Sequence, residues 1–247
     1  MISYLNISVQ ALTDTPISKK LFAEKTTLST AEKRVLREDI ERIVMKGLLQ
    51  TRTIGIAAYV DDESAYDQIV FAQVDIRTLN KVSAITTMIQ SAFPVPMFVI
   101  LHHDDNYSVN WCVKRINQAD KSKRVMEEQQ MTRFFSIHEN NSVIDSWLHS
   151  LDITKINCKS LKELFDELSN RLMMLSVSDE AGCFIEIESG GAEYYKSILE
   201  KLNQNRLLQQ SIIKELQSET QFNRIIKLNT QLRELQDQEI NSLDRLK

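Results

Sequence analysis

Residues 214–236 have the sequence KELQSETQFNRIIKLNTQLRELQ, which contains neither glycine nor proline. Apolar residues recur in it at steps of three and four, with charges and amides between them, and this is the period of an amphipathic helix. From Ala192 to Lys247 we find no residue that would break a helix. One straight helix over 192–247 would be about 80 Å long at roughly 1.5 Å per residue. The sequence therefore predicts a long C-terminal helical arm.

The apolar residues of this arm fall into two blocks, which the polar residues QSETQ at 217–221 separate. Four residues of the second block have the heptad spacing of a coiled coil, namely Ile225, Leu228, Leu232 and Leu235. Glu239 and Ser242 take the next two positions of this register, so the heptad pattern is imperfect.

Two arrangements of such an arm are open. It is either an amphipathic helix lying on its own domain, or a coiled-coil segment that pairs with a partner chain or folds as a helical hairpin. Because a helix this long exceeds what a domain of this size covers, we expect the second block to dock onto another helix, in a partner chain or a second copy. The predicted partner-binding residues are Phe222, Ile225, Leu228, Asn229, Leu232 and Leu235.

Composition limits the class of protein. The chain has 247 residues, 43% of them apolar and 26% charged, which is ordinary for a globular protein with a sizeable core. A net charge of −4 argues against a uniformly basic nucleic-acid coat but leaves room for a local basic face. No apolar run is long enough for a membrane helix, and the N-terminus does not resemble a secretory signal. The three cysteines lack metal-ligand or disulfide spacing, so a reducing cytoplasm is the expected location.

The N-terminal part alternates helical and strand patterns. A capping box of Ser29 and Glu32 predicts a helix that carries Val35 to Val44 on its apolar face and ends at Gly47. Two β-runs around the polar turn DDESAYD follow, and then a helix with Val82, Ile85, Ile89 and Ala92 on its buried side.

Further strands and helices are expected beyond this helix. The run 97–101 is continuously apolar, as in a central strand, and 107–114 alternates as a strand with its aromatic residues inward and its polar residues outward. MTRFFSI at 131–137 predicts another short strand, and helical patterns cover 143–151 and 160–175, the second with a capping box of Ser160 and Glu163.

The fold class that we predict is α+β, with a mixed, mostly antiparallel sheet and packed helices over residues 1–175. A glycine-containing linker over 176–191, with a short strand at Cys183–Ile187, would connect this domain to the helical, coiled-coil-like arm over 192–247.

Two short motifs suggest metal chemistry, but neither is specific. HHDD at 102–105 holds metal-ligand residue types, although Asp104, Asp105 and Asn106 are turn formers. VDIR at 74–77 places Asp75 and Arg77 on one face, where a restriction-type nuclease would have an acid and a lysine. We therefore predict no catalytic residues, no metal and no cofactor, and keep a metal-dependent nuclease centred on Asp75 as the alternative.

A basic segment lies at 114–124 (KRINQADKSKR). Phosphate contacts from such a segment would be weak, salt-sensitive and independent of base sequence. A solvated basic surface is the competing interpretation. The candidate nucleic-acid-binding residues are Lys114, Arg115, Lys121, Lys123 and Arg124.

Several stretches together resemble one bacterial family, the domain-of-unknown-function family DUF4391. They are PISKKLFAEKTTLSTAEKRVLREDIERI at 16–43, AFPVPMFVIL at 92–101, CVKRINQADK at 112–121 and ETQFNRIIKLNTQLREL at 219–235. The resemblance implies an accessory protein of restriction or anti-phage defence islands, encoded beside helicases and DNA methyltransferases. It carries over no catalytic residue.

The expected function is therefore a non-catalytic accessory or assembly subunit of such a defence system. It would dock to a protein partner of the helicase or DNA methyltransferase type through its C-terminal arm. A homo-oligomer is also compatible with this arm, and no contact with a membrane is expected. The alternatives are the nuclease and a nucleic-acid-binding module that uses the basic segment.

Overall fold

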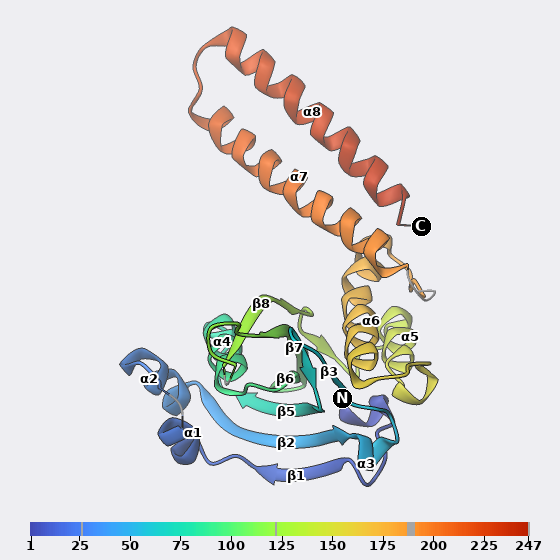
Figure 1. The fold of residues 1–247 in the computed structure, drawn as a ribbon. Coiled ribbons are helices and arrows are strands. Elements are labelled where there is room, and N and C mark those ends of the chain that lie inside the picture. Colours follow the sequence, from blue (N-terminus) through green and yellow to red (C-terminus); the bar gives the residue numbers. More distant parts are fainter. Residues whose placement is uncertain (26, 122, 187–190, 247) are drawn as a thin grey trace. The chain divides into compact units, whose positions relative to one another are not determined.

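A computed structural model describes residues 1–25, 27–121, 123–186 and 191–246. The chain forms two compact units, residues 1–173 and 174–247, and the boundary between them falls inside helix α6. In the first unit the elements are η1 Ile2–Leu5, β1 Leu12–Pro16, α1 Lys19–Lys25, α2 Thr30–Glu38, β2 Ile40–Gln50, α3 Thr51–Ile54, β3 Tyr59–Val60, β4 Ala65–Tyr66, β5 Gln68–Ile76, α4 Val82–Ala92, β6 Met97–His103, β7 Asn106–Ile116, β8 Arg124–Met131, β9 Phe135–Ser136, α5 Ser142–Ser150 and η2 Ile153–Lys155 (Figure 1). Helix α6 Leu161–Ala181 follows, and α7 Ala192–Ser218 and α8 Phe222–Asp244 complete the second unit.

The main sheet has the strand order β1-β2-β5-β6-β7-β8, with β9 paired to β7, and β3 and β4 form a separate small hairpin. Strands β5 and β6 run parallel and are joined by α4, whereas the other neighbouring pairs of the described sheet run antiparallel. The predicted α+β class with a mixed, mostly antiparallel sheet is confirmed. Among the described residues, no helix is both long and apolar enough to span a bilayer.

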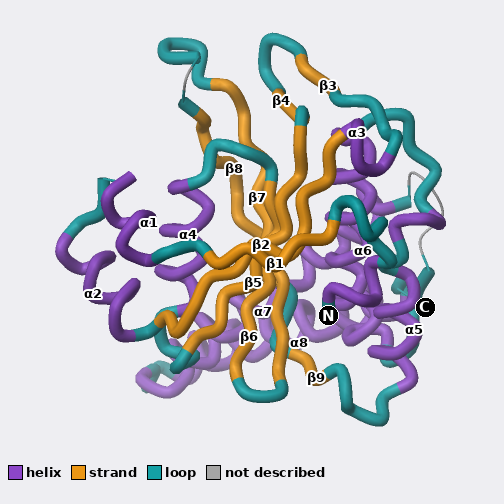
Figure 2. The backbone as a smooth tube through the Cα atoms, turned by 90° about the horizontal axis from the view of Figure 1, so that it is seen from below, coloured by secondary structure: helices purple, strands orange, loops and turns teal. Residues whose placement is uncertain are grey.

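Helices cover both faces of the central strands (Figure 2). On one face, Val70, Ala72 and Val74 of β5 belong to a core cluster with α4 residues such as Ile85 and Ile89. On the other face, Phe98 of β6 packs on Phe165 of α6 with 4.7 Å between ring centroids. Double coverage explains why residues 97–101 are continuously apolar, and the central strand predicted there is confirmed.

The helix predicted from Ser29 is confirmed only as far as Glu38. The capping box is present, since Glu32 N donates to Ser29 Oγ and Ser29 N donates to Glu32 Oε2. From Ile40 onward the chain is strand β2, so the predicted helical face through Val44 is wrong. Ile40 lies opposite Ile76 and Ile43 opposite Val74, and this pairing with a strand distant in sequence overrides the local helical period.

Gly47 does not end a helix but lies inside β2. An added Cβ there would be 3.3 Å from the Phe71 side chain, and the β2 register shifts between Met45 and Gly47. Glycine therefore allows the close approach of a neighbouring aromatic ring beside a bulge.

Strand β7 is buried on both faces, which corrects the prediction that its polar residues point outward. Ser108, Asn110 and Lys114 are as buried as Val109 and Trp111 on the opposite face of the strand. Each of them has hydrogen-bond partners: Ser108 Oγ donates to Thr132 O at 2.7 Å, and Asn110 Oδ1 accepts from Gln90 Nε2 of α4 at 3.0 Å. The alternating pattern predicted the strand, but it did not predict that α4 covers the polar face of this strand.

Lys114 is a buried amine that ties β7 to the end of α4. Its Nζ donates to Phe93 O at 2.7 Å and to Val95 O at 3.0 Å, and Phe93 is the C-cap residue of α4. Burial lowers the pKa of Lys114 to about 8. The side chain satisfies carbonyl groups that the helix end and the following turn leave without partners.

The segment after residue 175 differs from the predicted linker. Helix α6 continues to Ala181, and Gly182 then adopts a left-handed conformation with φ of 71°. Residues 183–186 form no strand, so the strand predicted at Cys183–Ile187 is wrong over those residues, and Ile187 lies outside the described residues.

We predict that Lys114→Met changes how the free energy of unfolding depends on pH. The unfolded chain keeps the lysine proton up to about pH 10.4, whereas the folded chain releases it at about pH 8. Between these values the unfolded state binds more protons, so this lysine makes stability rise with pH. From pH 8 to pH 10 the wild type should therefore gain up to about 3 kcal/mol relative to the variant.

Urea unfolding at several pH values measures this difference. The exposed Lys121→Met is the control, which should follow the wild type. Parallel curves for wild type and Lys114→Met would contradict the expectation.

Candidate protein-binding face of the helical hairpin

The C-terminal arm is a helical hairpin rather than one straight helix. Helices α7 and α8 lie side by side and run antiparallel (Figure 1). The chain leaves the helix between Ser218 and Phe222. There Glu219 Oε1 accepts from the amides of Thr220 and Gln221 at 2.9 Å each, and Arg224 bonds both Glu219 and Glu215. The polar run 217–221, which separates the two apolar blocks, contains the turn, because it has no apolar side chain to bury.

The heptad stripe of α8 faces α7. Leu228 is buried, and Ile225, Leu232 and Leu235 are half-buried. On α7 the buried residues include Ile198, Leu202 and Asn205, and Asn205 Nδ2 donates to Leu235 O at 3.0 Å. We call the following residues the hairpin seam: Asn205 of α7, and Ile225, Leu228, Leu232 and Leu235 of α8.

The predicted occupant of the stripe is therefore corrected. We expected a helix of a partner chain or a second copy, and the helix that the stripe meets is α7 of the same chain. An intramolecular helix a few residues away has a high effective concentration, so it occupies the stripe before any partner.

Glu239, which interrupts the heptad pattern, takes part in an ion-pair network. Arg206 of α7 donates Nε to Glu239 at 2.7 Å and both terminal amino groups to Glu180 at 2.6 and 2.8 Å. The hydrogen bonds that Arg206 donates to the carboxylates of Glu180 and Glu239 raise the pKa of Arg206. The bond from Arg206 likewise lowers the pKa of Glu239. A charged pair at this place favours one register of the two helices, because a slip would leave the partners unpaired.

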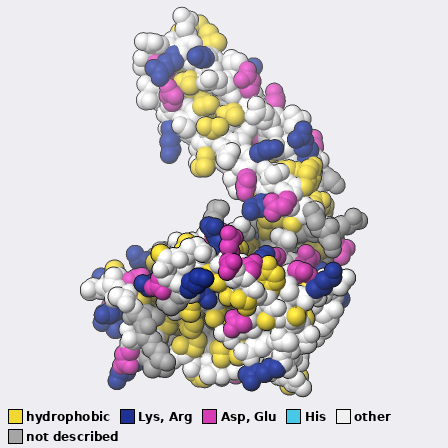
Figure 3. Space-filling model, in the orientation of Figure 1, with side chains coloured by type: hydrophobic (Ala, Val, Ile, Leu, Met, Phe, Trp, Pro, Cys, Tyr) yellow, Lys and Arg dark blue, Asp and Glu magenta, His cyan; other side chains and the backbone are white. Residues whose placement is uncertain are grey.

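Large apolar side chains remain exposed outside the seam, with exposed fractions from 43% to 74%. They are Leu207, Leu208, Ile213, Phe222, Ile226 and Ile240. Figure 3 shows hydrophobic side chains on the surface of the hairpin, including its end that carries the turn.

Three of these side chains lie near the turn. Phe222 and Ile226 are one helical turn apart on α8. The ion pair between Arg224 and Glu215 fixes α8 beside the last turns of α7, where Ile213 lies. We call Ile213, Phe222 and Ile226 the tip patch. Lys214 and Lys227, which follow Ile213 and Ile226 in the sequence, are exposed, while Glu215 and Glu219 are engaged by Arg224.

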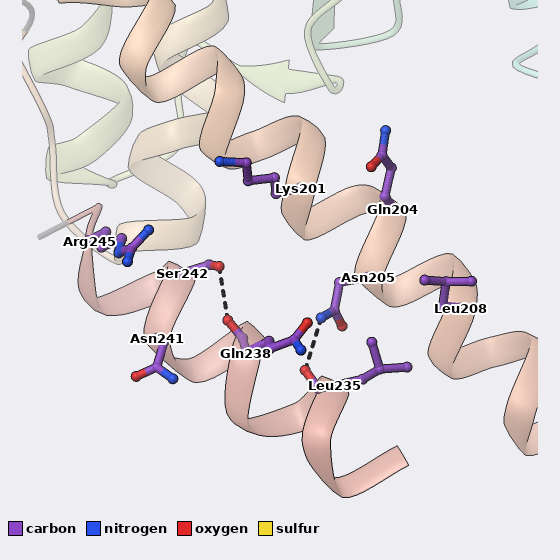
Figure 4. Close-up of a pocket in the computed structure, with 9 residues that line it drawn as sticks. All are labelled: Lys201, Gln204, Asn205, Leu208, Leu235, Gln238, Asn241, Ser242 and Arg245. Carbon is purple, nitrogen blue, oxygen red and sulfur yellow. Dashed lines mark hydrogen bonds between the residues drawn. The ribbon is translucent and has the colours of Figure 1, made fainter. Parts of the chain in front are cut away.

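A hollow of about 410 Å³ lies elsewhere along the hairpin (Figure 4). Its wall combines amides and a hydroxyl with Leu208, Leu235 and the cations Lys201 and Arg245. Ser242 Oγ donates to Gln238 O at 2.9 Å and so bonds within its own helix. The hairpin therefore presents a hollow with both polar and apolar lining and a separate apolar tip patch.

The predicted partner-binding residues divide between seam and surface. Phe222 is 74% exposed, and Asn229 is exposed with its Nδ2 donating to Ile225 O of the same helix. The other four, Ile225, Leu228, Leu232 and Leu235, belong to the seam. The heptad criterion missed Ile213 and Ile226, and their signal in the sequence is that they are apolar but lie outside the heptad register.

The basic segment is less available than its sequence suggests. Lys114 is buried against backbone carbonyls, so it does not reach a phosphate, and its assignment to nucleic-acid binding is corrected. Arg115 pairs with Glu127 at 2.5 Å, and Lys123 pairs with Asp120 at 3.1 Å. Arg124 Nη1 donates to the carbonyls of Lys121 and Lys123.

The two metal motifs are brought together at one end of the sheet, because Asp75 of β5 lies opposite His102 of β6. Asp75 bonds Arg42, Gln73 and His102, while Arg77 donates to backbone carbonyls at the end of α2. HHDD ends in the predicted turn, where Asp104 has a φ of 51°. Within the described residues no group of three or more histidine, cysteine, aspartate or glutamate side chains is arranged to hold a metal ion.

Comparison with known proteins identifies one family. Residues 5–238 match the family described as "Domain of unknown function (DUF4391)". No curated protein and no solved structure matches the chain.

We predict that Leu228→Ala loosens the hairpin. Removing a buried leucine side chain from the seam should cost about 2–4 kcal/mol. Hydrogen exchange of α7 and α8 amides measures the loss of protection, and β5 amides in the other unit should keep theirs. The matched control is Leu207→Ala, which truncates a side chain that is 65% exposed. An equal loss of protection in the two variants would contradict the packing of Leu228 in the seam.

For the basic segment we predict, at most, weak binding that decreases with salt. The triple variant Lys121→Gln, Lys123→Gln, Arg124→Gln removes at most about three phosphate contacts. The slope of log affinity against log salt should then become shallower by roughly 2–3. Fluorescence anisotropy with a labelled duplex measures both quantities. An unchanged slope would show that the segment is a solvated surface.

Proposed function

We propose that this chain, which belongs to the DUF4391 family, is a non-catalytic accessory subunit that binds a protein partner through the tip patch of its helical hairpin. The observation that carries the proposal is the exposure of Ile213, Phe222 and Ile226 on a hairpin whose seam is already filled. These side chains are not needed to hold α7 and α8 together, and exposed apolar groups of this kind favour a protein–protein contact.

The packing of the hairpin supports this role. Buried seam residues and the Arg206 network hold the two helices in one register. A surface that is ordered before binding loses less conformational entropy in the complex, so a small apolar patch suffices for affinity. Helix faces recognised by apolar grooves are a common mode of protein recognition.

The charge around the tip patch indicates the chemistry of the partner. Lys214 and Lys227 are exposed, and the neighbouring carboxylates of Glu215 and Glu219 are paired with Arg224. An apolar groove with an acidic rim would complement this surface. The resemblance to accessory proteins of restriction and anti-phage defence islands suggests a cytoplasmic helicase or DNA methyltransferase as the chain that carries such a groove.

We predict that the double variant Phe222→Asp with Ile226→Asp loses the partner. Two carboxylates in an apolar groove with an acidic rim cost desolvation and add repulsion. The chain is co-expressed with the products of its neighbouring genes, and the purified complex is weighed by native mass spectrometry. The wild type should co-purify with a neighbour, whereas the variant should be recovered alone and folded.

The control variant is Gln231→Asp with Gln238→Asp. It introduces the same charge on exposed positions of α8 outside the tip patch and should keep the partner. Co-purification of the Phe222 and Ile226 variant, or loss of the partner in the control alone, would exclude the tip patch. A wild type that binds none of the neighbouring gene products would exclude a partner of the suggested kind.

A further inference from the structure

The parallel pair β5 and β6 creates a second candidate site, in the unit formed by residues 1–173. In sheets with a β-α-β connection, ligands bind in the crevice beyond the carboxyl ends of the parallel strands. Asp75 and His102 stand at those ends, opposite one another. A hollow of about 490 Å³ opens there, and its wall includes Arg42, Asp75, Arg77, His102, His103 and Asp104.

Asp75 is the buried anchor of this hollow. Its Oδ1 accepts from Gln73 Nε2 at 2.7 Å and from His102 Nδ1 at 3.0 Å, and its Oδ2 accepts from Arg42 Nε. Burial alone would raise the pKa of Asp75, but the hydrogen bonds from Arg42, Gln73 and His102 outweigh burial and lower it. The carboxylate therefore stays ionised and holds two donors in place.

The orientation of His102 follows from that anchor. An ionised carboxylate only accepts hydrogen bonds, so the His102 proton lies on Nδ1 and its Nε2 is left for another contact. The ring also stacks on Tyr107, with 4.6 Å between centroids. Two constraints thus fix one imidazole at the wall of the hollow.

Arg42 and Arg77 are anchored in a similar way. Arg42 gives its Nε to Asp75, and the described residues offer no hydrogen-bond partner to its two terminal amino groups. Arg77 donates Nη1 to the carbonyls of Arg37, Glu38 and Ile40 at 3.2, 2.9 and 3.1 Å, which leaves its Nη2 and Nε. Each guanidinium is held at one side and keeps donors on the other.

We propose that this hollow binds a phosphoryl group, with Arg42 and Arg77 as the donors. Arg42 comes from β2 and Arg77 directly follows β5, and arginine forks match the geometry of a tetrahedral phosphate. The ligand is either a small phosphorylated molecule or a phosphate of a nucleic-acid backbone. The site lies outside the hairpin, so it does not rest on the proposed partner binding.

The hollow holds charges of both signs. Glu41, Asp75 and Asp104 bring three carboxylates, while Arg42 and Arg77 bring two guanidiniums. Asp75 is already engaged by Arg42 Nε, Gln73 and His102, so it does not occupy the terminal amino groups of the two guanidiniums.

The test is NMR of the histidine ring protons in the full chain, titrated with inorganic phosphate at pH 6. We expect a saturable shift of the His102 resonance. We also expect at least about tenfold weaker binding in Arg42→Met, which removes one fork. Arg42→Lys keeps the positive charge but loses the guanidinium fork, so its affinity for phosphate should lie between those of the wild type and Arg42→Met. The matched control is Arg52→Met, an exposed arginine of α3 outside the hollow, which should bind as the wild type does.

Two further titrations distinguish the sources of the phosphoryl group. Tighter binding of a nucleoside monophosphate than of a short single-stranded oligonucleotide supports a small-molecule ligand, and the reverse order supports a nucleic-acid backbone. The proposal is overturned by a non-saturating shift at about 50 mM phosphate, a concentration above weak millimolar affinity. It is also overturned if Arg42→Met, with an otherwise folded spectrum, binds phosphate as the wild type does.

Discussion

The parallel pairing of β5 and β6 is the constraint on which the first unit depends. Both strands carry apolar side chains on both faces, so both faces must be covered. A parallel pair also needs a crossover connection, and α4 supplies both the crossover and one of the two covers. The same pairing aligns the carboxyl ends of two strands and thereby brings Asp75 to His102.

The second unit satisfies the same physical requirement within one hairpin. A long amphipathic helix gains little from forming alone in water, because its stability comes from packing its apolar stripe. The apolar stripe of α8 packs on α7, because the three-residue turn between the two helices keeps them close together. Apolar residues outside that stripe are left exposed, and this is why we base the proposed function on them.

In both units, charged side chains connect separate elements: Lys114 and Asp75 are buried, and Arg206 is half-buried. Lys114 joins β7 to the end of α4, and Asp75 joins β5 to β2 and β6. Arg206 joins α7 to α8 and to the last turns of α6. Such residues cost desolvation, which the hydrogen bonds offset only in the correct arrangement, so they favour one register over its alternatives.

The sequence by itself determined the local features of this protein. The Ser29 capping box, the apolar run 97–101 and the period of the C-terminal arm depend on neighbouring residues, and each of them predicts its own element. Tertiary structure alone decided whether Ile40 and Ile43 belong to a helix or a strand, because their partners in β5 are more than thirty residues away. It also decided that Lys114 is buried, that Asp75 meets Arg42 and His102, and that the stripe of α8 is filled by α7. Contacts between distant residues leave no periodic trace in a single sequence, which is why the candidate sites required the folded chain.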